Sequence, residues 1–184
     1  IKFELLKSQI NPHFLFNSLN VLSGLISKDA KKAEQFVDEF SHIYRYVLDT
    51  IEQTVTPLEK ELDFIRSYFF LQEIRYGASL THSINLPASI MNCYLPPLSF
   101  QIIVENAIKH NVVNESKPLH IDIAFENNFI IISNKIEPKI SRGKSTGIGL
   151  KNLQKRYAMI GGIQPDFHVD NNRFIARLPI IEQY

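Results

Sequence analysis

Two helical stretches joined by a short connection constrain the fold of this chain more than any other feature of its 184 residues. Apolar side chains recur at helical spacing over residues 1–26 and again over a second stretch that ends near Ile51. The connection, residues 27–30, is so short that the two stretches predict an antiparallel helical hairpin. Two such helices cannot cover each other's apolar faces completely. We therefore expect two hairpins to pair as a four-helix bundle, which would make the protein a homodimer.

Pro12 interrupts the first of these helices and leaves two arrangements open. Proline removes a helical N–H group and crowds the preceding turn, which predicts a bend over residues 8–12. Alternatively, Asn11 caps a helix whose first residue is Pro12. The apolar phase continues through the proline, which favours the bend.

One histidine lies on the polar side of this first helix. His13 shares that side with Asn17 and Asn20, whereas the opposite face is apolar. The apolar stripe consists of Ile10, Phe14, Leu15, Leu19, Val21, Leu22, Leu25 and Ile26. An exposed imidazole is mostly neutral at neutral pH and keeps a nitrogen lone pair, so His13 can act as a nucleophile. For a histidine taken alone, a surface residue without a role is the more frequent case.

A strong helix-start signal marks the predicted boundary between two domains. Thr56 is suited to the N-cap, Pro57 to the first helical position and Glu59 to closing a capping box. We expect a dimerising hairpin in residues 1–54 and a second domain in residues 55–184.

The second domain alternates helices with strands. Its first helix turns Leu58, Leu62, Ile65 and Phe69 inward and ends at Gly77. Alternating apolar residues predict strands over residues 80–86, 119–125, 129–133, 167–169 and 174–178, with turns at the Asn-Asn pairs 127–128 and 171–172. Two more helices are expected over residues 97–111 and 148–160. This order predicts an α+β fold, an α/β sandwich in which a mixed sheet carries its helices on one face.

The composition excludes several functions. The 20 basic and 19 acidic residues give a net charge of +1, so we expect no nucleic-acid partner. A single cysteine, Cys93, allows no internal disulfide and no multi-cysteine zinc site. No apolar run is long enough to span a membrane, and the chain begins at Ile1 in the middle of a helical pattern. We expect a cytoplasmic fragment of a longer protein.

A second candidate site lies on the helix expected over residues 97–111. Asn106 and His110 are one turn apart on one face, with Lys109 beside them. An amide oxygen suits Mg²⁺, and the lysine and the histidine can meet phosphate oxygens. An amphipathic helix with a solvated polar side would show the same spacing, so this pattern alone leaves both interpretations open.

Two glycines precede and begin the helix expected over residues 148–160. Gly147 and Gly149 allow backbone N–H groups to approach a phosphate, and the helix N-terminus adds a partial positive charge. Before them, residues 135–144 carry four basic side chains and few large apolar ones. We expect this segment to be a mobile basic lid that is loose until a triphosphate binds. A plain solvated loop is the alternative.

Three motifs resemble those of a known enzyme family. Residues 11–17, NPHFLFN, are similar to the phosphoacceptor region of LytS-like sensor histidine kinases. Residues 104–110, VENAIKH, resemble the N box of the GHKL family of ATPases and kinases, and residues 145–152, STGIGLKN, resemble its G2 box. The resemblance covers nearly the whole chain. It implies that a GHKL-type, or Bergerat-type, ATP-binding domain follows the hairpin.

The resemblance also implies roles for individual residues. His13 would be autophosphorylated, and Asn17, one turn further on, would orient it. ATP and Mg²⁺ would bind to the second domain, with Asn106 as the metal ligand. The implied nucleotide-binding residues are Asn106, Lys109, His110, Asn134, Gly147, Gly149, Leu150 and Asn152.

Two positions depart from the family pattern. Ile102 stands where many GHKL proteins have Glu or Asn, which removes a second ligand or general base from this helix. Asn134 stands where an Asp-x-Gly-x-Gly box would offer an aspartate to the adenine amino group. Its amide oxygen can still accept a hydrogen bond.

We therefore expect a sensor histidine kinase core that autophosphorylates and passes its phosphoryl group to an aspartate of a response regulator. The sensor and any membrane contact are expected in an N-terminal region outside this sequence, within an inner-membrane protein. The alternative is a dimerisation and nucleotide-sensing module with weak or no catalysis, which would bind nucleotide without transfer. A helix-turn-helix DNA reader is disfavoured, because the chain lacks a basic recognition helix.

Overall fold

The computed structural model describes residues 12–140 and 147–184. The elements, in order, are α2 (Pro12–Lys28), α3 (Ala30–Thr50), β1 (Thr56–Pro57), α4 (Leu58–Tyr76), β2 (Leu80–Asn85), β3 (Tyr94–Leu95), α5 (Ser99–His110), β4 (Leu119–Glu126), β5 (Phe129–Lys135), α6 (Ile148–Ile160), β6 (Asp166–Asp170) and β7 (Arg173–Pro179). Short 3-10 helices, Gly77–Ser79 and Ala88–Ile90, flank β2.

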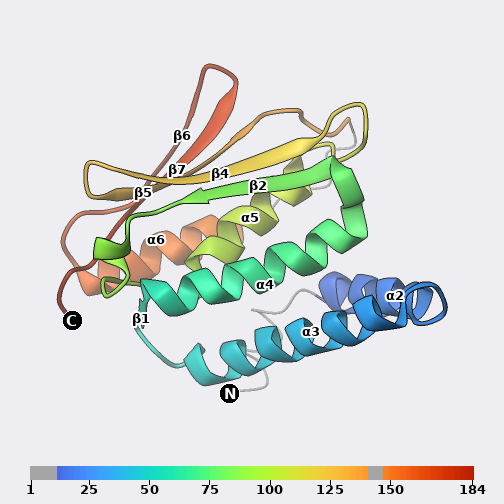
Figure 1. Cartoon of the computed structure of the whole chain (residues 1–184). Helices are drawn as coiled ribbons and strands as arrows, with labels where there is room; N and C mark the ends of the chain where they lie inside the picture. Colours follow the sequence, from blue (N-terminus) through green and yellow to red (C-terminus); the bar gives the residue numbers. More distant parts are fainter. Residues whose placement is uncertain (1–11, 141–146) are drawn as a thin grey trace.

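Helices α2 and α3 form the antiparallel hairpin that the sequence predicts (Figure 1). A single residue, Asp29, separates them, and its Oδ1 accepts a hydrogen bond from the backbone N of Lys32 at 3.1 Å. This bond satisfies one of the N–H groups that the first turn of α3 leaves without an acceptor. The choice between a bend before Pro12 and a helix start at Pro12 depends on residues outside the described part.

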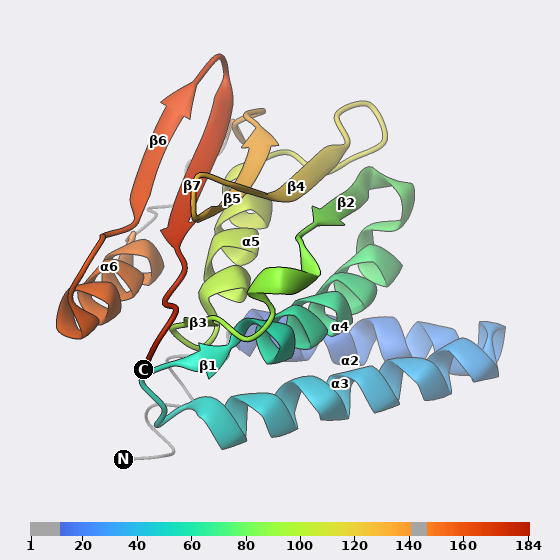
Figure 2. The same ribbon diagram turned by 60° about the vertical axis from the view of Figure 1, so that its left-hand side comes forward.

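Aromatic side chains hold the hairpin against α4. Phe14 of α2 stacks on Tyr68 of α4, with 5.3 Å between the ring centroids. Tyr46 of α3 stacks on Phe64 of α4 at 4.7 Å. Pairs of this kind each contribute about 0.5 to 1.5 kcal/mol beyond the burial of their area. Helix α4 consequently lies between the hairpin and α5 (Figure 2).

The other side of the hairpin carries exposed apolar residues. Leu19 and Ile26, which the sequence places in the apolar stripe, are 51% and 63% exposed in the single chain, as expected if two helices cannot cover their apolar faces completely. Phe16, Val37 and Leu48 are exposed as well. Because α4 covers only one side of the hairpin, these five side chains form its exposed apolar surface.

The main sheet has five strands in the order β2-β4-β5-β7-β6. Strands β2 and β4 are parallel, and the other neighbours are antiparallel. Tight turns at Asn127-Asn128 and Asn171-Asn172 join β4 to β5 and β6 to β7, with positive φ at each asparagine. Helices α4, α5 and α6 cover one face of the sheet (Figure 1). The predicted α+β fold, a hairpin followed by a mixed sheet, is confirmed.

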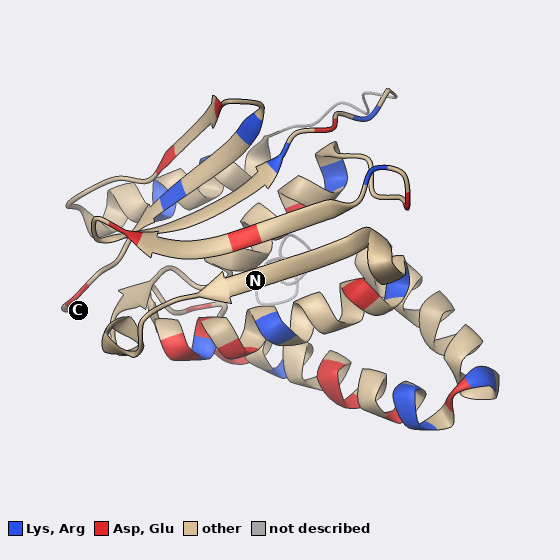
Figure 3. Cartoon of the chain, turned by 45° about the horizontal axis from the view of Figure 1, so that its top comes forward, with Lys and Arg blue, Asp and Glu red and all other residues tan. Residues whose placement is uncertain are grey.

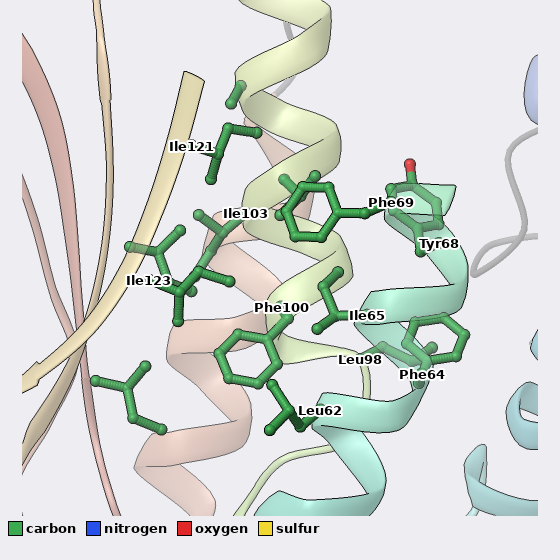
Figure 4. Packing of buried hydrophobic residues seen from close by; sticks show 14 of the residues in the cluster. Leu62, Phe64, Ile65, Tyr68, Phe69, Leu98, Phe100, Ile103, Ile121 and Ile123 are labelled. Carbon is green, nitrogen blue, oxygen red and sulfur yellow. The ribbon is translucent and has the colours of Figure 1, made fainter. Parts of the chain in front are cut away.

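The main core lies between that face of the sheet and the helices α4 and α5 (Figure 4). Alternate residues of β4, beginning with Leu119, Ile121 and Ile123, are buried in it. The inward residues predicted for α4 are all buried as well: Leu58, Leu62, Ile65 and Phe69. Gly77 ends this helix with φ 60°, as the sequence predicts.

The predicted capping box at the start of α4 is wrong. Thr56 lies in the short strand β1, which pairs with β3, and the helix begins at Leu58. The backbone N of Leu58 donates to the carbonyl of Cys93 at 2.8 Å, and that of Glu59 donates to the carbonyl of Met91 at 3.1 Å. Because the loop before β3 supplies these acceptors, the helix needs no side-chain cap.

Charged residues are spread over the described chain. Figure 3 shows Lys and Arg interspersed with Asp and Glu along the helices and strands. Within residues 12–140 and 147–184, no helix combines the length and apolarity needed to cross a membrane.

One carboxyl group is completely buried where α4 meets α5. Oε1 of Glu61 accepts a hydrogen bond from the backbone N of Phe100 at 3.4 Å, and Oε2 accepts one from the hydroxyl of Tyr46 in α3. Burial raises the pKa of Glu61 to about 7. The hydrogen bonds from Tyr46 and from the backbone at Leu98, Phe100 and Ser99 act in the opposite direction and limit this increase.

Glu61→Gln should flatten the dependence of stability on pH. The pKa in the folded protein, about 7, exceeds the ordinary value of 4.5, so the folded state binds this proton more tightly than the unfolded chain. The stabilisation is complete below about pH 4.5 and is lost as the pH rises through 7. Relative to the variant, the wild type should lose about 3 kcal/mol between pH 4.5 and 8, since a tenfold change in proton affinity corresponds to about 1.4 kcal/mol. Urea denaturation at several pH values measures this; parallel profiles would contradict it.

Candidate active site

The second half of α5 presents the polar residues expected to bind a nucleotide. Asn106 and His110 are half-buried, and Lys109 is exposed. Burial lowers the pKa of His110, and the positive charges of Lys109 and Lys139 lower it further. A neutral imidazole thus lies close to two cations, and this setting attracts polyphosphates.

The segment that follows β5 is tied to the end of α5. The backbone N of Val112 donates to the carbonyl of Glu137 at 2.8 Å, and the backbone N of Lys139 donates to the carbonyl of His110 at 3.3 Å. These bonds connect the first part of the predicted lid to the end of α5. Residues 141–144 of the predicted lid lie outside the described residues.

Asn111 strengthens the same connection. Its Oδ1 accepts a hydrogen bond from the backbone N of Glu137 at 2.8 Å, and its Nδ2 donates to the carbonyl of Ala107 at 2.9 Å. The Glu137 carboxylate in turn lies 3.4 Å from Nζ of Lys135 and 3.7 Å from Nζ of Lys117. Part of the basic charge of the segment is therefore already paired within the protein.

Gly147 and Gly149 stand at the start of α6 for different physical reasons. Gly147 has φ 61° and ψ 12°, a left-handed conformation that favours glycine. A Cβ on Gly149 would lie 3.3 Å from Cγ2 of Ile102 in α5. Gly149 therefore allows the two helices to pack closely. Of the neighbouring candidates, Leu150 is half-buried and Asn152 is exposed.

Asn134 lies near the end of β5, on the face of the sheet that carries the helices. It alternates with Ile130 and Ile132, which are buried on that face, and is itself only 2% exposed. Its Nδ2 donates to the carbonyl of Lys135 at 3.0 Å. The amide is thus on the same side of the sheet as α5.

The candidate phosphoacceptor lies on the hairpin. His13 is exposed on α2, and Asn17, one turn further on, is half-buried. Asn17 lines a small cleft between the hairpin and α4. The other residues of this cleft are Phe14, Ser18, Val21, Phe36, Leu71, Gln72 and Arg75.

The structure connects the elements that carry the candidate nucleotide residues and places the candidate phosphoacceptor on a different helix. The contact between Ile102 and Gly149 joins α5 to the start of α6, and the bonds of Asn111 join the end of α5 to the segment after β5. Helix α2 packs against α3 and α4, whereas α5 packs against α4 and α6 (Figures 1 and 4). His13 and Asn106 therefore lie on opposite sides of α4.

The donor groups around Asn106 fit a magnesium ion that is shared with a substrate. Among the described residues, no group of three His, Cys, Asp or Glu side chains could hold a metal ion. Mg²⁺ in nucleotide sites keeps several waters and takes further ligands from the phosphates. One amide oxygen, from Asn106, is compatible with that arrangement.

Sequence reasoning missed three polar residues that the structure places at key contacts: Tyr46, Glu61 and Asn111. Glu61 does carry a signal, because it falls in helical phase with the inward residues Leu58 and Ile65. Asn111 carries no such signal, because its partner, Glu137, is distant in sequence.

Comparisons with known proteins agree with the motifs. The family model for "Histidine kinase" matches residues 1–80. "Sensor protein LytS" of Enterococcus faecalis is 29% identical over 182 residues, which cover 90% of this chain and 31% of the relative. "Sensor histidine kinase/phosphatase LytS" of Staphylococcus aureus is 37% identical over 119 residues, which cover 65% of this chain and 20% of the relative. The chain thus matches less than a third of the length of these relatives.

These matches show that the chain is similar to histidine kinases, and that the relatives it matches are LytS sensor proteins. Among solved structures, the Acinetobacter baumannii histidine kinase AdeS is similar over 93% of this chain and 96% of its own, at 11% identity and a TM-score of 0.45.

Asn111→Ala should release the segment after β5 from α5. The variant removes the acceptor of the Glu137 N–H group, and a hydrogen bond contributes about 1 kcal/mol, so exchange of that amide hydrogen should accelerate about fivefold or more. Hydrogen exchange followed by NMR measures this rate. The control is Asn114→Ala, which removes an exposed amide that binds Ser116 and Lys117 instead. Equal Glu137 rates in the two variants would show that Asn111 does not hold the segment.

Proposed function

We propose that this chain binds Mg²⁺–ATP, transfers the γ-phosphoryl group to His13 and passes it on to an aspartate of a response regulator. One observation carries the proposal: an exposed histidine in the motif NPHFLFN shares a chain with a second cluster of polar and glycine residues around α5. Similarity to histidine kinases supports the reaction class.

His13 would act as the nucleophile in this reaction. A nitrogen lone pair of its imidazole attacks the γ-phosphorus, the new N–P bond forms, and the bond to the ADP oxygen breaks. The imidazole proton is released to solvent, and a neutral imidazole needs little help from a base. Asn17, one turn away on α2, would orient the ring.

The second cluster would bind and orient the nucleotide. Asn106 would ligate the Mg²⁺, which neutralises phosphate charge as the phosphoryl group transfers. Lys109, His110 and the N-terminus of α6 around Gly147 and Gly149 would contact the phosphates. Leu150 and Asn152 belong to the same helix start, and Asn134 would accept a hydrogen bond from the adenine amino group.

Transfer also requires a rearrangement or a second copy, because His13 and Asn106 lie on opposite sides of α4. A homodimer is supported by the exposed apolar surface of the hairpin, formed by Phe16, Leu19, Ile26, Val37 and Leu48. We propose that the hairpin, residues 1–54, and the nucleotide-binding domain, residues 55–184, are the two parts that move. A sensor region at the membrane, as in an inner-membrane sensor, would belong to the longer protein.

A nucleotide-sensing module without transfer is the second candidate. The packing of Ile102 against Gly149 favours it, because an apolar side chain occupies the position of a second acid or amide on α5. Incubation with Mg²⁺ and γ-labelled ATP separates the two candidates. Phosphohistidine is acid-labile, so label that acid removes supports the kinase, whereas bound nucleotide without covalent label supports the module.

His13→Ala should abolish phosphorylation and leave nucleotide affinity unchanged within about twofold, since α4 separates the histidine from the nucleotide residues. Autoradiography and a fluorescent ATP analogue measure the two properties. His42→Ala, which removes another exposed histidine of the hairpin, is the matched control and should retain phosphorylation. Loss of both properties in His13→Ala would contradict the division into two parts.

Asn106→Ala should weaken Mg²⁺-dependent nucleotide binding about tenfold or more, because the metal loses a protein ligand. The melting temperature should stay within a few degrees of the wild type, since a half-buried amide contributes little to the core. Titration with and without Mg²⁺ measures the first effect, and Asn114→Ala is the control. A large fall in melting temperature with normal affinity would make Asn106 a structural residue.

A further inference from the structure

Helix α5 has no N-terminal cap of its own. Its N-cap residue, Leu98, has no polar side chain, and the hydroxyl of Ser99 donates to the carbonyl of Pro96. The first-turn N–H groups of a helix have no acceptor within the helix, and here they are buried. Glu61 of α4 supplies the acceptor, with its Oε1 3.4 Å from the backbone N of Phe100.

The backbone conformation at Leu98 and Ser99 is suited to binding this carboxyl group. Leu98 has φ 65° and ψ 16°, a left-handed conformation that leucine seldom adopts, and Ser99 begins the helix. A left-handed residue next to a helical one turns successive N–H groups toward a common centre, which makes an anion-binding nest. The backbone N of Phe100 donates to Oε1 of Glu61 at 3.4 Å, and the backbone at Leu98 and Ser99 also acts to lower the pKa of this carboxyl group.

The same carboxyl group is bound from the hairpin. The hydroxyl of Tyr46 in α3 donates to Oε2 of Glu61. The ring of Tyr46 stacks on Phe64 of α4, and Oγ1 of Thr56 lies 3.5 Å from its hydroxyl. One carboxyl group therefore connects three helices, of which α3 belongs to the hairpin and α5 carries Asn106.

We propose that Glu61 is a positioning residue for α5, and that its hydrogen bond from Tyr46 couples the hairpin to this helix. Phe100 and Asn106 are about 9 Å apart along the axis of one continuous helix, so a displacement of the first turn also moves Asn106. The hairpin also carries His13, in the first turn of α2. The link to the nucleotide rests on the proposed function, whereas the positioning of α5 does not.

Tyr46→Phe in the full chain tests the positioning. It keeps the stacked ring and removes the donor to Glu61. The Phe100 N–H group donates to Glu61, and no other acceptor is found for it among the described residues. Its hydrogen exchange therefore reports on the nest directly, and it should accelerate at least about threefold. The matched control is Tyr44→Phe, since the hydroxyl of Tyr44, also on α3, is buried without a hydrogen-bond partner among the described residues. That variant should leave the Phe100 rate unchanged.

A second arm tests the coupling to the nucleotide. Mg²⁺ with a non-hydrolysable ATP analogue should slow exchange around Tyr46 at least twofold in the wild type and in Tyr44→Phe, and have no such effect in Tyr46→Phe. If Tyr46 had a structural role alone, its substitution would change the hydrogen-exchange rates, but these rates would not depend on the nucleotide analogue.

Equal Phe100 exchange in the wild type and Tyr46→Phe, or equal acceleration in Tyr44→Phe, would overturn the proposal. Binding of the analogue without any response in α3 would overturn the coupling. Failure of the analogue to bind would instead contradict the proposed function, and the exchange of Phe100 would still decide whether Glu61 positions α5.

Discussion

The Glu61 carboxyl group provides a hydrogen-bond acceptor for the buried first turn of α5. Helix α5 must begin in the dry space between α4 and the sheet, where its first-turn N–H groups cannot reach water. A neighbouring helix supplies the acceptor, but a buried carboxyl group then needs partners of its own. It receives them from the backbone at Phe100 and from the hydroxyl of Tyr46. The packing of the hairpin on α4 and the placement of α5 therefore depend on the same group.

Helix α5 is fixed at both ends by contacts that are distant in sequence. Glu61 holds its first turn, and Asn111 ties its last turn to the backbone of Glu137. Between these anchors lie Ile102, which packs against α6, and Asn106. In the proposed function Asn106 would be a metal ligand, and these anchors would orient it before a substrate arrives, which lowers the ordering cost of binding. The polar residues of α5 thus gain their geometry from buried bonds at the two ends of the helix.

The limits of sequence reasoning follow from what periodicity encodes. Spacing identifies the face that an element buries, so the inward residues of α4 and the alternation in β4 and β5 were predictable, and paired asparagines with a tolerance for positive φ marked both tight turns. Spacing does not identify the partner across a contact. The capping box of Thr56 and Glu59 was locally plausible, yet carbonyl groups from a loop some 30 residues away cap α4 instead. The same limit explains why Glu61 was overlooked.

Gly149 illustrates how one residue can satisfy two demands. The sequence suggested that this glycine lets the backbone approach a phosphate, and the structure gives an independent reason, because a Cβ would press against Ile102. Ile102 is apolar and branched, and such a side chain fits against a bare Cα in a way that a solvated carboxylate would not. Ile102 on α5 and Gly149 on α6 thus form a matched pair. The close approach of the two helices depends on both residues, so this glycine serves helix packing in addition to any role at the positive N-terminus of α6.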